Sequence, residues 1–249
     1  MDLLYEPYEY MKNVYNEQNI ILNFLFSTFI YCVSYPFLYY FLNSCFDKFK
    51  KYSKDKKFYI VSNLLKYFVL NVVSYFFLAM LYYDLDLFNL QNWYEYDKLL
   101  KNLSSLYVCT DIISIFLNWG KMKSTTFYHH ICTTLALIYI CSIDFNHNGV
   151  NKAIVIYGGF SSLAGIVNLF LGVRFLMENK LHIYYLTRVS YLIYLLICFF
   201  NWNWQLYYLI NLMIYENYTL LRFIENFFYV IMLYFWIYDD LVLMKYLKN

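Results

Sequence analysis

The sequence has little charge and almost no proline. Only 14% of its 249 residues are Asp, Glu, Lys or Arg, whereas 62% are hydrophobic, and the mean hydropathy is +0.43. This composition excludes an ordinary soluble domain and indicates a membrane protein. The two prolines are Pro7 and Pro36, so the long apolar runs contain one candidate kink, in the first of them.

The chain also lacks the residue patterns of several functional classes. Its net charge of +2 comes without a basic patch interleaved with aromatic side chains, which excludes a nucleic-acid partner. The six cysteines show no C-x-x-C spacing, so we expect buried thiols rather than a zinc site or a disulfide framework. Four histidines are too few for a membrane di-iron oxygenase. The sequence therefore predicts no metal site and no bound cofactor.

Seven apolar runs approach the roughly 20 residues that an α-helix needs to cross the hydrocarbon of a bilayer. No strand-like alternation persists within them, and an open sheet cannot span a membrane. The predicted fold class is all-α: a polytopic membrane helical bundle of about seven transmembrane helices, with six as the alternative. The predicted spans are 20–42, 58–83, 103–119, 127–144, 153–176, 184–201 and 220–244.

Lysine and arginine are unevenly divided between the two sides of this bundle. The Lys-rich segment 48–57 lies on the same side as 121–123, 174–188 and 245–248, and the opposite loops carry few basic residues. Cytosolic loops are enriched in Lys and Arg, so we expect the C-terminus in the cytosol and the N-terminus in the lumen. Residues 1–19 lack the basic segment of a cleavable signal peptide, so the first span is expected to be an uncleaved anchor.

Ionisable side chains inside the third and fourth spans form the candidate site. Asp111 lies within the third run, and His129 and His130 lie early in the fourth. Ionisable groups are costly in hydrocarbon and therefore indicate function. An imidazole can act as general base, nucleophile or proton shuttle, and a carboxylate can hold its tautomer. The alternative interpretation is two interfacial histidines that reach to water and an Asp paired with a neighbouring Tyr or Asn.

The helical rise predicts how far apart these groups lie. Asp111 is expected about 12 Å below the cytosolic end of its span, and the histidines about 3 to 5 Å below the start of theirs, so direct contact is not expected. Adjacent residues are about 100° apart around a helix, so one imidazole should face the bundle interior and the other a neighbouring helix. Helical metal chelation needs histidines at i and i+4, which argues against a metal here.

Four sequence features, in chain order, resemble a known family. They are Y-x-x-x-D at Tyr107 and Asp111, F-x-H-H at Phe127 to His130, Val167-Asn168, and Arg174. Together they resemble the TLC domain family, which includes ceramide synthases, translocon-associated proteins and small lipid-homeostasis proteins. The resemblance covers residues 55–245 and implies a TLC-like transmembrane domain there. Residues 1–54 would then supply the lumenal N-terminus, the first anchor and the basic cytosolic loop.

The resemblance also implies a function and a set of site residues. It implies a multi-pass endoplasmic reticulum protein of lipid metabolism or membrane lipid homeostasis, with membrane lipid or acyl-CoA as partner. By position, His129 and His130, with Asp111, would be the catalytic residues of an acyl-CoA-dependent N-acyltransferase. Acyl-CoA would be a co-substrate rather than a bound cofactor. The candidate substrate-binding residues are Tyr107, Asn168 and Arg174.

The sequence departs from the catalytic relatives in one respect that leaves turnover open. Ceramide synthases carry two aspartates in the span after the histidine pair, whereas residues 157–168 contain no acidic residue. The alternative is therefore a non-catalytic TLC protein that binds lipid or regulates membrane composition. A fatty-acid elongase would need H-x-x-H-H, and Thr126 occupies the first position. A seven-helix receptor or channel is less favoured, because only one polar cluster is evident.

Overall fold

The computed structural model describes residues 5–83, 93–117, 120, 122–145, 149–215 and 219–248. Within these ranges every regular element is a helix and none is a strand, so the all-α prediction is confirmed. The helices are α1 (Tyr5–Glu17), α2 (Ile20–Cys45), α3 (Asp47–Lys50), α4 (Lys54–Tyr83), the 3-10 helix η1 (Trp93–Tyr96), α5 (Asp97–Leu117), α6 (Ser124–Ser142), α7 (Val150–Leu163), α8 (Ile166–Val173), α9 (Lys180–Tyr215) and α10 (Leu220–Lys248).

Five described helices are long and apolar enough to cross a membrane: α2, α4, α5 together with η1, α9 and α10. The pair α7 and α8, bent by 40° at a short break, would be a sixth. Each of the seven predicted spans overlaps a helix or this pair, and residues 118–119 of the third span lie outside the described residues. Helix α6 is not among these helices, and it opens with the polar sequence STTFYHH. Five or six spans are therefore supported, and the seventh stays a prediction.

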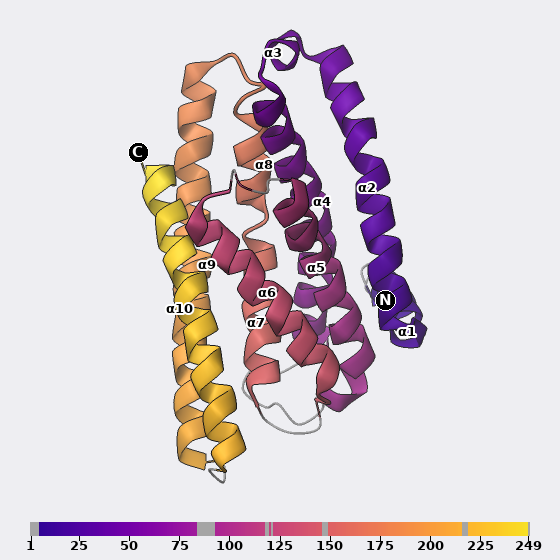
Figure 1. The fold of residues 1–249 in the computed structure, drawn as a ribbon, viewed down its shortest axis with the longest axis vertical. Helices are drawn as coiled ribbons and strands as arrows, with labels where there is room; N and C mark the ends of the chain where they lie inside the picture. Colours follow the sequence, from indigo (N-terminus) through magenta and orange to yellow (C-terminus); the bar gives the residue numbers. More distant parts are fainter. Residues whose placement is uncertain are drawn as a thin grey trace.

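Most helices run along the long axis of the molecule, and α6 crosses them obliquely (Figure 1). It packs between α5 and α10, while α4 packs against α7 and α8. Helices α9 and α10 form an antiparallel pair along one side (Figure 1). This arrangement turns the two histidine side chains of α6 toward the bundle, whereas Tyr128 beside them is 50% exposed.

Two basic segments that are distant in the sequence meet at one end of the molecule, at the top of Figure 1. Lys48 Nζ donates to the carbonyl of Met177 at 2.6 Å, and the Tyr52 hydroxyl donates to the carbonyl of Phe175 at 2.8 Å. The α2–α4 and α8–α9 connections therefore share an end, as the distribution of Lys and Arg predicts. Which compartment this end faces remains a prediction.

The outer faces of the long helices are apolar. Phe37 on α2 is 74% exposed, and Leu220 and Tyr234 on α10 are 77% and 63% exposed. Many further Phe, Leu and Ile side chains on α2, α9 and α10 are exposed in the same way. Such surfaces suit contact with lipid, which solvates apolar side chains.

Helix α4 approaches α7 closely because α7 carries glycine at the contact. A Cβ atom at Gly159 would lie 2.3 Å from the ring of Phe77 on α4. The adjacent Gly158 has no neighbouring atom within 4 Å of the same position. Small residues at a helix interface allow such close approach.

The predicted domain boundary between residues 54 and 55 falls at the start of α4, and α2 packs along α4 and α5.

Candidate functional site

A buried carboxylate on α5 is at the centre of the site. Asp111 is fully buried, and its Oδ1 lies 2.6 Å from Nζ of Lys66 on α4 and 3.1 Å from Nδ1 of His130 on α6. Three helices thus bring opposite charges and an imidazole to one oxygen atom. The sequence analysis missed Lys66, although a lysine in the middle of the apolar run 58–83 was a usable signal.

The two histidines face different partners. His129 Nδ1 lies 3.5 Å from Oδ2 of Asp239 on α10, whereas His130 faces Asp111. Asp239 is held in turn by the Thr126 hydroxyl, which donates to its Oδ1 at 3.0 Å. The imidazole ring centroids are 5.6 Å apart and the rings are nearly perpendicular, at 85°. Adjacent histidines in one turn of α6 therefore lie beside carboxylates of two different helices, α10 and α5.

The contact between His130 and Asp111 corrects the expectation that these residues are too far apart. Helix α6 begins at Ser124, three residues before the predicted span, and α5 ends at Leu117. Asp111 and His130 are therefore each six residues, or about 9 Å of helical rise, from the connection between the two helices. The similar depth of the two residues explains the 3.1 Å separation.

Several buried polar atoms of this site have no hydrogen-bond partner among the described residues. They include Asp111 Oδ2, His129 Nδ1 and His130 Nδ1. Buried polar atoms are normally hydrogen-bonded, so each exception needs an explanation, such as a catalytic role or a bound ion. The two Nδ1 atoms already lie beside carboxylate oxygens, at 3.1 Å for His130 and 3.5 Å for His129, so Asp111 Oδ2 is the one of the three that is left for a ligand.

A cavity of about 670 Å³ opens beside the histidines. Five of the six predicted site residues line it, and the sixth, Asp111, lies behind His130. The volume is within the range of small-molecule sites. The predicted residues lining the cavity are Tyr107, His129, His130, Asn168 and Arg174.

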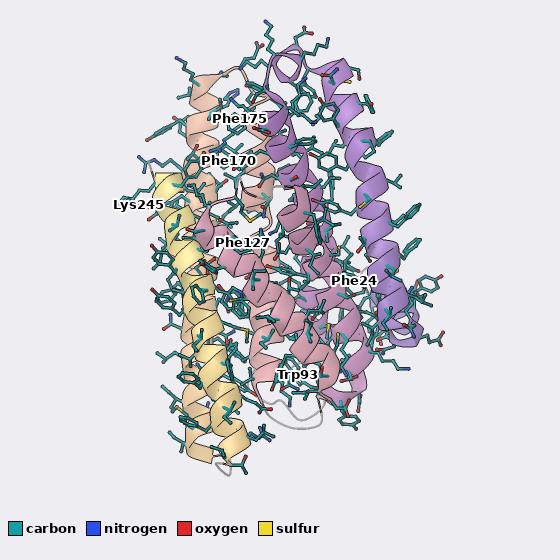
Figure 2. The ribbon with its side chains drawn as sticks, viewed as in Figure 1. Phe24, Trp93, Phe127, Phe170, Phe175 and Lys245 are labelled. Carbon is teal, nitrogen blue, oxygen red and sulfur yellow. The ribbon has the colours of Figure 1, made fainter. Side chains whose placement is uncertain are left out.

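One end of this cavity is basic. Lys56, Lys123 and Arg174 line it, and none of the three forms an ion pair with a carboxylate in the described ranges. The Arg174 guanidinium lies 4.5 Å from the ring centroid of Phe175 and 4.9 Å from that of Tyr246. Figure 2 shows Phe175 toward the end with the α8–α9 connection. The cavity thus combines uncompensated positive charge at this end with the histidines further in.

A second buried carboxylate, on α10, also lines the cavity. Asp240 is 7% exposed and accepts hydrogen bonds from the hydroxyls of Tyr157 and Tyr194, both at 2.6 Å. The Trp202 indole N–H donates to it at 3.4 Å. The sequence analysis did not single out this residue or Asp239, although two adjacent aspartates within the last apolar run were visible. Residues 157–168 contain no acidic residue, and Asp239 and Asp240 of α10 supply carboxylates to the lining of the cavity.

Asp111, His129 and His130 are also the described residues that could hold a metal ion. Each offers one ligand atom, and the three atoms lie within 4.8 Å of one another. Two imidazoles and a carboxylate are a donor set that zinc accepts. The sequence argument against a metal considered only one helix, whereas α5 supplies the third donor. However, the ammonium of Lys66 already supplies positive charge at Asp111.

No protein-family model, curated protein or solved structure matches the chain. The TLC resemblance therefore stays a prediction from the sequence. The fold and the site define a class: an all-helical protein with five or six helices able to cross a membrane. Within that bundle, an internal cavity is lined by buried histidine, aspartate and basic side chains.

Proposed function

We propose that this chain is a TLC-like endoplasmic reticulum membrane protein of lipid metabolism that transfers an acyl group from acyl-CoA to a lipid amine. The observation that carries the proposal is the pair His129 and His130 on the wall of a large cavity, with Asp111 directly behind His130. This is a base with an orienting carboxylate, at a place where a substrate can reach it.

The chemistry assigned to these residues is general-base acyl transfer. The amine nitrogen attacks the thioester carbonyl, a C–N bond forms, and the C–S bond breaks. An imidazole takes the proton that the nitrogen loses and returns it to the departing thiolate. Asp111 orients His130, and Lys66 offsets the negative charge of Asp111, so that the imidazole need not be protonated to balance it.

The two ends of the acyl-CoA would meet different surroundings. The phosphates would bind Lys56, Lys123 and Arg174 at the basic end of the cavity. A smaller apolar pocket of about 60 Å³ beyond His129 would receive only a short part of the acyl chain. Tyr107 and His129 line both spaces, so the thioester would lie between them. Because CoA esters are cytosolic, the basic end would face the cytosol, with the N-terminus lumenal.

The test is amide formation by the purified full chain in nanodiscs, given a long-chain acyl-CoA and a long-chain primary amine. We expect mass spectrometry to detect the N-acyl product, and the double variant His129→Ala/His130→Ala to lose it while its thermal unfolding stays cooperative. Lys51→Met, in the exposed basic loop, is the matched control. Absence of product from the wild type with every acyl-CoA length tried would refute the proposal.

A non-catalytic lipid-binding protein is the second candidate, and the ion pair between Lys66 and Asp111 favours it. Lys66 lies 2.6 Å from Asp111 and is therefore a strong partner for it besides His130. Such an ion pair is also expected where buried charges only stabilise the fold. In this case the double histidine variant would leave cellular lipid products unchanged and would alter only lipid retention by the purified protein.

A further inference from the structure

Asp240 forms a second polar centre in the same cavity, and nothing above gives it a role. It belongs to α10 and lines the cavity together with Asp239 and the histidines. From its surroundings we infer that Asp240 binds the protonated amine of the lipid that accepts the acyl group. This inference rests on the proposed function, because it names the acceptor side of the same cavity.

The first argument is charge. Asp240 is 7% exposed, and no Lys, Arg or His of the described chain forms an ion pair with it. By contrast, Asp111 has Lys66. A buried carboxylate without a cation is unfavourable, so a positively charged ligand group would be stabilised there more than a neutral one.

The second argument is the arrangement of the donors around the carboxylate. Tyr194 donates to Oδ1, and Tyr157 and Trp202 donate to Oδ2. These bonds favour the ionised carboxylate and fix its orientation. A carboxylate can accept about four hydrogen bonds, so the three donors leave one acceptor position of Asp240 unused. Because Asp240 lines the cavity, a ligand can supply the fourth donor.

The third argument is the aromatic surroundings of the carboxylate. All three donors are aromatic side chains, and one of them, Tyr194, lines the cavity together with Asp240. An aromatic ring beside the carboxylate suits an ammonium group, because the faces of such rings also attract cations. A phosphate would be repelled by Asp239 and Asp240, and it has the basic end of the cavity available instead.

The position of Asp240 connects binding to the reaction. Its chain neighbour Asp239 lies 3.5 Å from His129 Nδ1. Asp240 and His129 line the same cavity, so an ammonium bound at Asp240 shares it with an imidazole that can take one proton and leave the free amine. The imidazolium releases that proton to water, and the amine then attacks the thioester as described above, with the neutral imidazole carrying its second proton to the thiolate.

The experiment compares two ligands that differ only in charge and headgroup: octadecylamine and octadecanol. Binding to the full chain in nanodiscs is measured without acyl-CoA, so the result is independent of turnover. We expect the wild type to prefer the amine. In Asp240→Asn, which keeps the size and the aromatic donors, amine affinity should fall at least about tenfold while alcohol affinity stays the same. Asp144→Asn, an exposed acid outside the cavity, is the matched control.

Three results would overturn the inference. They are equal wild-type affinity for amine and alcohol, an unchanged amine affinity in Asp240→Asn, and an equal loss for both ligands in that variant. The first result needs no variant, and so it holds even if Asp240→Asn fails to fold. Tyr194→Phe, which removes one hydrogen bond, should weaken amine binding by a smaller factor. If the amine binds through Asp240 but no amide forms with acyl-CoA, Asp240 is still an amine-binding residue, and acyl transfer is refuted.

Discussion

Asp111 shows how one carboxylate can serve two partners at once. Lys66 and His130 approach the same oxygen from different helices, at 2.6 Å and 3.1 Å. Lys66 supplies a positive charge directly at the carboxylate. The cost of removing either partner therefore differs in kind: loss of Lys66 leaves a buried charge, whereas loss of His130 leaves an ion pair intact.

The first prediction concerns this ion pair. Lys66→Met should destabilise the protein by about 3–5 kcal/mol, because Asp111 remains buried without a full compensating charge. The double variant Lys66→Met/Asp111→Asn should recover part of that loss. Chemical unfolding in detergent measures both, and Lys51→Met should stay within about 0.5 kcal/mol of the wild type. Equal stabilities of the Lys66 and Lys51 variants would contradict the ion pair.

The second prediction concerns metal binding by Asp111, His129 and His130. Lys66 already supplies a cation, so the wild type should retain no stoichiometric zinc after purification, and chelators should not lower its stability. Lys66→Met should bind zinc at least about tenfold more tightly, because a competing charge is removed from Asp111. Calorimetry and elemental analysis measure this. Zinc that co-purifies with the wild type and stabilises it would show instead that the site is a metal centre.

Residue-level reasoning from the sequence found the histidine pair, Asp111 and Arg174, but not Lys66, Asp239 or Asp240. Asp111 and the histidines belong to a spacing pattern in two helices that are adjacent in the sequence, and Arg174 belongs to the features that resemble the TLC domain family. The missed residues come from α4 and α10, and no local spacing reveals which helices pack together. A rule that marks every ionisable residue in an apolar run would have found all three.

Among the helices, the contact of α4 with α7 depends on a single missing side chain. Gly159→Ala places a methyl group 2.3 Å from the Phe77 ring, so we predict a loss of about 1–3 kcal/mol in stability. Gly158→Ala meets no atom within 4 Å and should be neutral or stabilising, by up to about 1 kcal/mol. Thermal unfolding of the two variants compares them directly. A Gly158 variant as damaging as the Gly159 variant would contradict this packing.

Helix positions were predictable because long apolar runs are strong signals, but two features of the helices were not. The start of α6 lies at Ser124 rather than 127, and this shift brings His130 level with Asp111. The break between α7 and α8 divides one predicted span, 153–176, into two helices. The ends and breaks of helices depend on individual polar and small residues. Hydropathy is averaged over many residues, so it does not show the effect of any one of them.

At the scale of the whole molecule, the charge distribution predicts sidedness. Lys51 and Thr219 lie in connections on opposite sides of the predicted topology. In sealed microsomes, Lys51→Cys should react with a membrane-impermeant maleimide, and Thr219→Cys should react only after permeabilisation. Both variants need a background in which the native cysteines are replaced, because Cys32, Cys45 and Cys141 are exposed. The reverse labelling pattern would invert the topology.

The polar opening of α6 has a consequence for how the chain is made. This helix is a poor candidate to enter a bilayer by itself, since its histidines and threonines would meet hydrocarbon before their partners arrive. Asp111 is synthesised first, but Asp239, the partner of His129, lies near the end of the chain. Biogenesis therefore cannot be completed helix by helix. A ribosome-bound chain stopped before α10 should remain accessible to chaperones and to membrane quality control until its last helix is released.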